Sequence, residues 1–257
     1  MGRLRAYNTF VGRQDIRLVL TAEEEAAWVR RWNGEREGEG CRLHRPELIQ
    51  TDLYRQFNNG SFGLGGRLYG GWWINTPKGL RRKITINGQP TVELDFSGCA
   101  IRMLYHERDI DYRDDPYRLG DIAAHEVKAG LPAGHFREGI KAITQALIND
   151  RKGKEPEKIQ LPGGLSFRPH FTRREIRQMI EAKHARIADA FGTGAGLRLQ
   201  RTDSDLALAI IAELMNQNVA ALPIHDSFLV SSTHRFIASD AMNRLYHGMF
   251  GFYPLIK

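Results

Sequence analysis

Two aspartates stand at positions where a carboxylate is costly. Asp95 lies in VELDFSGCAIRML, where a strand-like apolar run passes into further apolar residues, and Asp226 lies in PIHDSFLV between two short strand-like runs. Burying a carboxylate is unfavourable unless a cation or hydrogen-bond donors compensate it. Mg²⁺ prefers oxygen ligands, and two such ions about 3.5–4 Å apart stabilise the attacking and leaving oxygens of phosphoryl transfer. The pair predicts a site for two Mg²⁺ ions, for which Mn²⁺ is expected to substitute.

Each aspartate also has an ordinary structural explanation. Asp95 or Ser97 fits the N-cap of a helix that begins near Gly98. Asp226 fits an Asx residue in a hairpin turn. Glu93 falls on the same face of its strand as Asp95, either as a supporting carboxylate or as an outward-facing charge, and we do not include it in the predicted site.

A predicted helix around residues 136–149 carries an ordered polar row. Every fourth residue belongs to it, namely Arg137, Lys141, Gln145 and Asn149, and apolar residues occupy the opposite face. Such a row is most often a solvated surface. An Arg and a Lys one turn apart are nevertheless suited to a triphosphate, because Arg binds phosphate bidentately and Lys binds it as a point charge.

The elements that must position these residues mix strands and helices. Residues 63–97 are rich in glycine, aromatic and β-branched residues and indicate a sheet, with Asn87-Gly88 as a hairpin turn. Further strands are expected on both sides of His225-Asp226, and the last five residues are expected to add an edge strand. Helices are predicted over 21–32, 46–57, two patterns within 115–149 separated at 130–132, 172–191 (ending at the glycines of 192–196), 203–216 and 233–250.

Composition limits the classes of protein to which this chain can belong. The 257 residues are 42% hydrophobic, enough for a substantial core, and the formal charge of +7 suits a polyanionic partner or an ordinary basic enzyme. The two cysteines, Cys41 and Cys99, predict no disulfide framework and a reducing interior. No signal-peptide core and no run of about 20 apolar residues is present. We therefore expect a cytoplasmic protein with no membrane partner.

Three separated segments resemble one family in the correct order. ELDFSGCAIRMLYH, FREGIKAITQALIND and PIHDSFLV are similar to the first palm motif, the fingers helix and the second palm motif of family A DNA polymerases and the related single-subunit phage-type RNA polymerases. The resemblance implies Asp95 and Asp226 as metal ligands and Arg137 and Lys141 as triphosphate contacts. It also implies Lys141 as a proton donor to pyrophosphate, and Gln145 and Asn149 as further residues of the nucleotide site.

Two weaker segments agree with this resemblance. QRTDSDLALAI resembles the stretch whose glutamine, here Gln200, touches the minor groove of the primer and template, and GGRLYGG resembles the segment whose arginine, here Arg67, does the same. His225 is implied beside the primer terminus. Arg102 is implied as a structural arginine. The similar region spans about 63–257.

Departures from the family pattern are informative. Asn149 replaces the aromatic residue that the fingers helix usually presents, which argues against base-stacking closure on the nucleotide. Ala100 replaces the glutamate that blocks a 2′-hydroxyl in the DNA polymerases, so ribonucleotides are expected to fit, and Ser227 also resembles the RNA polymerase branch. About sixty residues precede the similar region. We expect low processivity unless a processivity factor or a helicase keeps the enzyme bound to the nucleic acid.

Basic clusters are expected to contact the phosphates of template and primer. One cluster, beside Trp72 and Trp73 as base-stacking candidates, is Arg81, Arg82 and Lys83; the others are Arg151, Lys152 and Lys154, and Arg173 with Arg174.

The sequence thus predicts an α+β fold, an antiparallel polymerase palm sheet with helical fingers and a small helical N-terminal lobe. The expected segments are 1–62 for the lobe, 63–111 and 173–257 for the palm, and 112–172 for the fingers. The expected activity is template-directed addition of nucleotides to a 3′-hydroxyl, with nucleic-acid template and primer and nucleoside triphosphates as partners, in the manner of a primase or small RNA polymerase. The alternatives are a compact family A-like DNA polymerase for repair or mobile-element replication, and a catalytically degenerate nucleic-acid-binding module.

Overall fold

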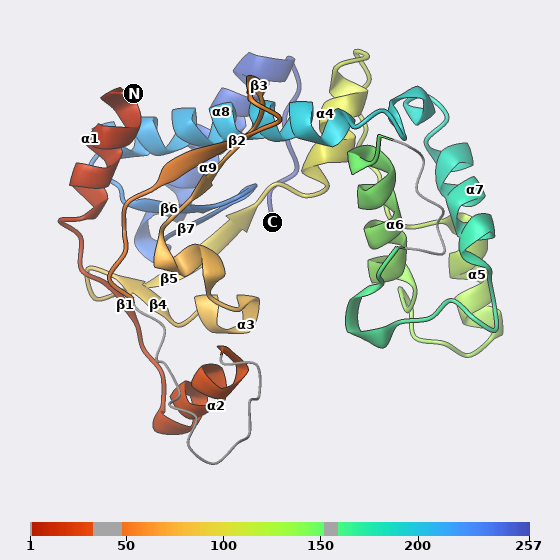
Figure 1. The fold of residues 1–257 in the computed structure, drawn as a ribbon, viewed down its shortest axis with the longest axis horizontal. Helices are drawn as coiled ribbons and strands as arrows, with labels where there is room; N and C mark the ends of the chain where they lie inside the picture. The colour runs from red at the N-terminus through yellow and green to blue at the C-terminus, as the bar shows by residue number, and fades with distance from the viewer. Residues whose placement is uncertain (1, 33–47, 152–158) are drawn as a thin grey trace.

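A five-stranded antiparallel sheet forms the centre of the protein, whose computed structural model describes residues 2–32, 48–151 and 159–257 (Figure 1). The strand order is β1 (Ile16–Leu18), β4 (Ile84–Ile86), β5 (Gln89–Asp95), β7 (Ser227–Ser231) and β6 (Ala221–Ile224). The antiparallel sheet with its many helices confirms the predicted α+β class.

Two tight hairpins build this sheet. Asn87 and Gly88 join β4 to β5 with φ of +52° and +75°, as a two-residue hairpin turn of this hand requires, so the predicted turn is confirmed. His225, at φ +56°, and Asp226 join β6 to β7. The register of β5 on β7 pairs Asp95 with Ser227, so both aspartates reach the same end of the sheet.

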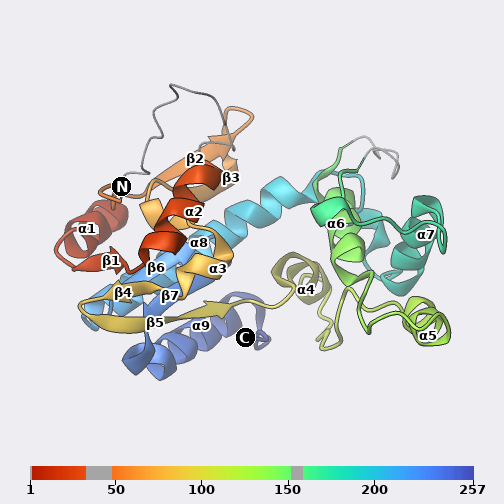
Figure 2. The ribbon, with the colours of Figure 1, turned by 90° about the horizontal axis from the view of Figure 1, so that it is seen from below.

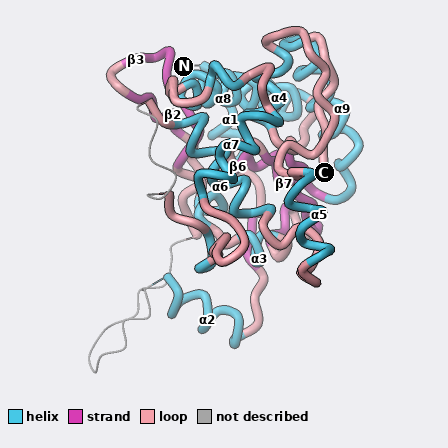
Figure 3. The backbone as a smooth tube through the Cα atoms, turned by 90° about the vertical axis from the view of Figure 1, so that its right-hand side faces the viewer, coloured by secondary structure: helices cyan, strands magenta, loops and turns pink. Residues whose placement is uncertain are grey.

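Two long helices pack on each other and on the sheet. They are α8 (Ala195–Asn216) and α9 (Arg235–Phe250), and α8 also contacts α1 (Gly2–Val11). A separate two-stranded ribbon, β2 (Tyr54–Asn58) and β3 (Ser61–Tyr69), lies on α8. Figure 3 shows α2 (Ala22–Trp32) projecting from this body.

A helical lobe stands beside the sheet body. It consists of α5 (Gly120–Lys128), α6 (Arg137–Asn149) and α7 (Arg173–Lys183), and Figure 2 shows α4 (Cys99–His106) and the start of α8 between the lobe and the sheet. A short helix α3 (Lys78–Arg81) precedes β4, after a 3-10 turn over Trp72–Asn75. Among the described residues, the helices are too short or too polar to cross a membrane.

Several predicted elements differ from the structure. The helix predicted over 46–57 is wrong within the described residues, because 54–58 form β2 and pair with β3; residues 46 and 47 lie outside the described ranges. The helix predicted to reach 191 ends at Lys183, where His184 turns inward to bond with Pro116. The helix predicted from 203 begins at Ala195, since Gly194 serves as its left-handed N-cap rather than ending the preceding helix.

Other details refine the N- and C-terminal predictions. The predicted helical lobe of 1–62 holds α1 and α2, and it also supplies β1 to the central sheet and β2 to the ribbon. The expected edge strand at the C-terminus is a single bridge between Phe96 and Ile256. Cys99 is buried and free, whereas Cys41, Lys152 and Lys154 lie outside the described residues.

Trp72 and Trp73 belong to the core, so the prediction that they stack on bases is wrong. Trp73 is fully buried and its indole Nε1 donates to the carbonyl of Pro223, 3.1 Å away, and Trp72 is 6% exposed. The two rings pack against each other edge to face beneath β6. Burial of these large rings fixes the segment that leads to α3.

The contact between α6 and α8 depends on a glycine. A Cβ on Gly196 would lie 1.9 Å from Oδ1 and 3.1 Å from Cα of Asn149. We expect Gly196→Ala to lower the free energy of unfolding in urea by about 1–3 kcal/mol, because the two helices must move apart. Asn149→Ala removes the nearest obstacle, so the same substitution should cost less in that background.

Gly120→Ala is the matched control, because a Cβ there meets no atom within 4 Å. An equal loss for Gly196→Ala in the wild-type and Asn149→Ala backgrounds would contradict this description of the contact.

Candidate active site

One cavity of about 340 Å³ opens where the carboxyl end of β5, the β6–β7 turn, α4, α6 and α8 meet. Most of the predicted site residues line its wall: Arg67, Arg81, Asp95, Ala100, Lys141, Gln145, Asn149, Gln200, His225 and Asp226. Segments that are far apart in sequence therefore meet at one place. Three predicted residues, Arg82, Lys83 and Arg137, do not line it.

The aspartate pair sits at the floor of this cavity. The backbone N–H of Phe96 donates to the carbonyl of Asp226 at 3.1 Å, which locks the two strand ends together. Burial, followed by the nearby charge of Asp226, raises the pKa of Asp95 to about 6, and Lys78 and Lys141 oppose the shift. Asp95 and Asp226 therefore form a concentration of negative charge that its neighbours compensate only in part.

The ordinary explanations for the two aspartates do not hold in this structure. The N-cap of α4 is Gly98, at φ +63°, without a side-chain capping bond, so neither Asp95 nor Ser97 caps that helix. The β6–β7 turn is closed by the hydroxyl of Ser227, which donates to the carbonyl of Ile224 at 3.1 Å. Within the described residues, the Asp226 carboxylate makes no hydrogen bond that would define an Asx turn.

The chemistry of this donor set fits a hard divalent cation. Two carboxylates supply oxygen ligands, and Mg²⁺ is commonly held by one or two carboxylates with water and substrate phosphates completing its shell. Within the described ranges, no three His, Cys, Asp or Glu side chains gather in a metal-binding arrangement. The site therefore suits ions whose coordination is completed by a phosphate ligand. It does not resemble a site in which protein side chains alone surround the ion.

Glu93 lines the cavity and is hydrogen-bonded there, so it is not a free outward-facing charge. Its Oε1 accepts hydrogen bonds from Arg81, at 3.0 Å, and from the hydroxyl of Ser227, at 2.8 Å. Arg81 is thereby held in the cavity wall. In contrast, Lys83 pairs with Glu24 at 2.6 Å on α2, and Arg82 is exposed outside the cavity.

Helix α6 forms the wall that carries the predicted nucleotide site. Lys141, Gln145 and Asn149 face the cavity. The amide of Gln145 donates to the hydroxyl of Tyr117 at 3.2 Å, and Nζ of Lys141 lies 5.9 Å from the centre of that ring. Tyr117 thus braces the polar face of α6 from the side.

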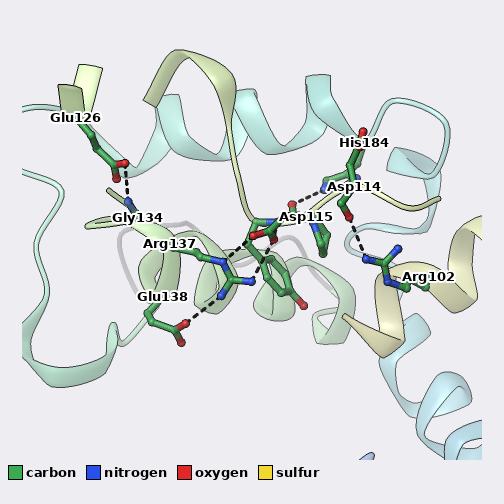
Figure 4. A network of polar contacts seen from close by, with 10 residues as sticks. Arg102, Asp114, Asp115, Glu126, Gly134, Arg137, Glu138 and His184 are labelled. Carbon is green, nitrogen blue, oxygen red and sulfur yellow. Dashed lines mark hydrogen bonds and ion pairs between the residues drawn. The ribbon is translucent and has the colours of Figure 1, made fainter. Parts of the chain in front are cut away.

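Arg137 lies on the same face of α6 but outside the cavity (Figure 4). Its Nε and a terminal nitrogen bond to the two oxygens of Asp115 at 2.9 and 3.1 Å, and Glu138 lies 3.3 Å from the guanidinium. Glu126 fixes the turn before the helix by accepting from the backbone N–H groups of Gly134 and Phe136. A triphosphate contact by Arg137 stays a prediction, and it requires Arg137 to leave Asp115.

Arg102 and His184 hold the link between α4 and the lobe. Arg102 donates to the carbonyls of Ser97, at 2.7 Å, and Asp114, at 3.0 Å, and Nε2 of His184 lies 2.9 Å from the carbonyl of Pro116 (Figure 4). These contacts tie the end of β5 to the segment that carries Tyr117. They agree with the structural role that the resemblance implies for Arg102.

Successive residues of α8 clamp the ribbon that carries Arg67. The hydroxyl of Ser204 donates to the carbonyl of Gly66, and Asp205 pairs with Arg55 at 2.9 Å. Arg201 donates to the carbonyl of Phe62 at 2.8 Å. The clamp brings Arg67 into the cavity wall, beside Gln200 of α8 and His225 of the turn. Burial lowers the pKa of His225, and Arg67 lowers it further.

Lys78, Tyr117 and Asp203 are polar side chains of the wall that sequence reasoning missed. Asp203 is 6% exposed, and burial, followed by the charge of Asp226, raises its pKa to about 7. A signal for it was present: Asp203 continues the apolar stripe of Leu206 and Ile210 by one further turn, so a carboxylate falls on the buried face of a helix. Tyr117 lies in a loop and Lys78 in the short helix α3, and neither segment has an apolar periodicity that would reveal a buried position.

Comparison with known proteins gives limited information. No protein-family model and no curated protein matches this chain. Among solved structures, it is similar to the polymerase domain of Pol1 from M. smegmatis, in a complex with DNA primer-template and dNTP, at 12% identity and a TM-score of 0.46. The match covers 90% of this chain and 50% of that one, so the chain spans about half the length of that structure. A likeness of this size identifies neither a family nor an activity.

The buried carboxylate of Asp203 should cost stability at neutral pH. Its pKa of about 7 exceeds the unfolded value of about 4, so stability is lost as the pH rises between these values. In urea unfolding with a chelator present, we expect Asp203→Asn to raise the free energy of unfolding by about 2 kcal/mol at pH 8 and by clearly less at pH 5. Asp121→Asn on the exposed start of α5 should change neither value. A less stable Asp203→Asn protein at pH 8 would refute this electrostatic interpretation.

Proposed function

We propose that this chain is a metal-dependent, template-directed nucleotidyltransferase that adds a nucleotide to the 3′-hydroxyl of a nucleic acid. The observation that carries the proposal is that one cavity collects Asp95 and Asp226 from adjoining strand ends and faces them with Lys141 of α6. The resemblance in sequence supports the same roles for these residues. The segments 63–111 and 173–257 would act as the palm, 112–172 as the fingers, and 1–62 as the N-terminal lobe.

Asp95 and Asp226 would hold the Mg²⁺ ions. When bound, the ions supply charge neutralisation at the reacting phosphate and lower the pKa of the attacking hydroxyl. In the reaction, the 3′-oxygen bonds to the α-phosphorus, the bond to the bridging oxygen of the β-phosphate breaks, and the hydroxyl proton passes to solvent. The cationic side chain of Lys141 neutralises the charge that develops on the departing pyrophosphate and donates a proton to it, and solvent then restores the proton of Lys141.

The other walls would orient the two substrates. Gln145 and Asn149 extend the α6 wall along the nucleotide, and Arg137 would join them on exchanging Asp115 for phosphate oxygens. Arg67, Gln200 and His225 form the opposite wall, where they would contact the primer and template. Arg81 of α3, held by Glu93, also lines the cavity.

Ala100 supports the use of ribonucleotides. Its methyl group lies in the cavity wall at the first turn of α4, where a longer side chain would occupy space beside the nucleotide sugar. We propose a primase-like or small RNA polymerase-like enzyme. Extension of a primer and synthesis without a primer, each with rNTPs and with dNTPs, test this, and strict use of dNTPs would favour the compact DNA polymerase instead.

Loss of either floor carboxylate should abolish activity. We expect Asp95→Asn and Asp226→Asn to reduce nucleotide addition, measured on gels with Mg²⁺ or Mn²⁺, at least about 10³-fold, because charge stabilisation of the transition state depends on both. Asp121→Asn is the control. If both variants kept full activity, the catalytic proposal would fail; if the wild type bound nucleic acid but added nothing, a degenerate binding module would be favoured.

Enlarging residue 100 should change sugar selection. We expect Ala100→Glu to reduce kcat/KM for rNTPs by about 10-fold or more relative to dNTPs, because steric exclusion of one hydroxyl is worth at least about 1.4 kcal/mol. Ala100→Ser, which adds one small atom, is the control. An unchanged ratio in Ala100→Glu would place the sugar elsewhere.

A further inference from the structure

Asp203 is a buried acceptor without a donor. Its side chain is 8% exposed and lines the cavity, and within the described residues its Oδ2 has no hydrogen-bond partner. The closest cationic atom is Nε of Arg67 at 3.7 Å, which is beyond hydrogen-bond distance, and that nitrogen is also unpartnered. A buried polar atom without a partner is costly, and native proteins keep few of them. Oδ2 is itself closed to solvent, so a donor on a ligand in the cavity would meet this carboxylate at Oδ1, which makes no hydrogen bond within the described residues.

The position of Asp203 identifies the part of the ligand that it meets. Asp203 lies one turn after Gln200 on α8 and beside Arg67, in the wall proposed above for the primer. Asp226 lines the same cavity. If the reacting 3′-hydroxyl lies at Asp226, as the proposed function requires, the terminal sugar of the primer lies next to Asp203.

Two kinds of donor are available in that region of a nucleic acid. In the minor groove, every base pair offers acceptors, and guanine alone offers an amino donor. A template-directed enzyme must extend ends that carry any base, so an acceptor that required guanine would reject most ends. The 2′-hydroxyl is a donor on every ribonucleotide, and it is attached to the carbon next to the one that bears the reacting 3′-hydroxyl.

The structure favours hydrogen bonding by Asp203 over metal ligation. Within the described residues, it does not complete a three-ligand group with Asp95 and Asp226. Ala100, on a different helix, independently leaves room for a ribonucleotide. Each incorporated ribonucleotide becomes the next primer end. An enzyme with space at Ala100 and an acceptor at Asp203 would therefore meet a 2′-hydroxyl on the incoming nucleotide and on the primer end.

We propose that Asp203 is a specificity-determining residue that accepts a hydrogen bond from the 2′-hydroxyl of the terminal primer nucleotide, so that RNA ends are extended in preference to DNA ends. This inference rests on the proposed function. Arg67 stays beside the carboxylate and binds the neighbouring minor-groove acceptor through its free guanidinium nitrogens.

The first test measures binding with chemistry blocked. Two labelled primer–templates differ in one atom of the terminal sugar, 3′-deoxyadenosine with a 2′-hydroxyl and 2′,3′-dideoxyadenosine without it, and neither can be extended. By fluorescence anisotropy, we expect the wild type to bind the first about tenfold more tightly, as one hydrogen bond to a carboxylate allows. Asp203→Ala should bring the ratio to about one, and Asp203→Asn, whose amide oxygen still accepts, should keep part of it.

Asp121→Asn is the control, since it removes an exposed carboxylate at the start of α5, outside the cavity, and should leave the ratio unchanged. Thermal unfolding of each variant checks that it folds. A wild-type ratio near one would overturn the proposal, and so would a full ratio in Asp203→Ala. Equal weakening on both primers would also overturn it, because Asp203 would then only position Arg67.

The second test separates this inference from the proposed function. Wild type and Asp203→Asn are given primers that end in ribose, 2′-deoxyribose or 2′-fluoro-2′-deoxyribose, all with a free 3′-hydroxyl. We expect the wild type to extend the ribose end fastest, and the fluoro end, which has no donor, to behave like the deoxy end. Absence of extension on all three would refute the polymerase function; equal extension of all three would refute the role of Asp203 and leave the function standing.

Discussion

The pairing of β5 with β7 brings two mutually repelling carboxylates to one end of the sheet. Backbone bonds, with the N–H of Phe96 donating to the carbonyl of Asp226, set this register, and the hydroxyl of Ser227 adds a side-chain bond to Glu93 across the two strands. Because a slip of either strand by one residue would turn every one of its side chains to the other face of the sheet, the repulsion is built into the fold. The negative charge of these two carboxylates is the constraint that the other residues of the cavity must balance.

The surrounding elements supply positive charge to the cavity, and their contacts with one another fix where that charge lies. Helix α6 presents Lys141 from one side, and the ribbon presents Arg67 from the other. Helix α8 connects the two, since its first turn touches α6 through Gly196 and Asn149 and its third turn holds the ribbon through Ser204 and Asp205. Movement of the lobe relative to the sheet would therefore be transmitted to both walls, which suits a site that must admit and release nucleotides.

Local signals in the sequence predicted the hairpin at Asn87-Gly88, the strands around Asp226 and the polar row of α6, because each depends on residues close together in the chain. Long-range contacts decided the features that were missed. The ribbon of β2 and β3 is held against α8 by contacts such as that of Arg55 with Asp205, 150 residues away, and α7 ends where His184 bonds to Pro116. The pairing of Arg67 with Asp203 joins a ribbon to a helix, and no spacing within either segment reveals it.

The central claim is that Asp95 and Asp226 hold divalent ions together with a nucleotide. Electron paramagnetic resonance of Mn²⁺ measures this directly, by titrating the ion into the wild-type protein with and without a triphosphate whose α–β bridge cannot be cleaved. We expect nucleotide-dependent Mn²⁺ binding that is lost in both Asp95→Asn and Asp226→Asn and kept in Asp121→Asn. Nucleotide-dependent binding of equal affinity in the wild type and both variants would contradict the claim.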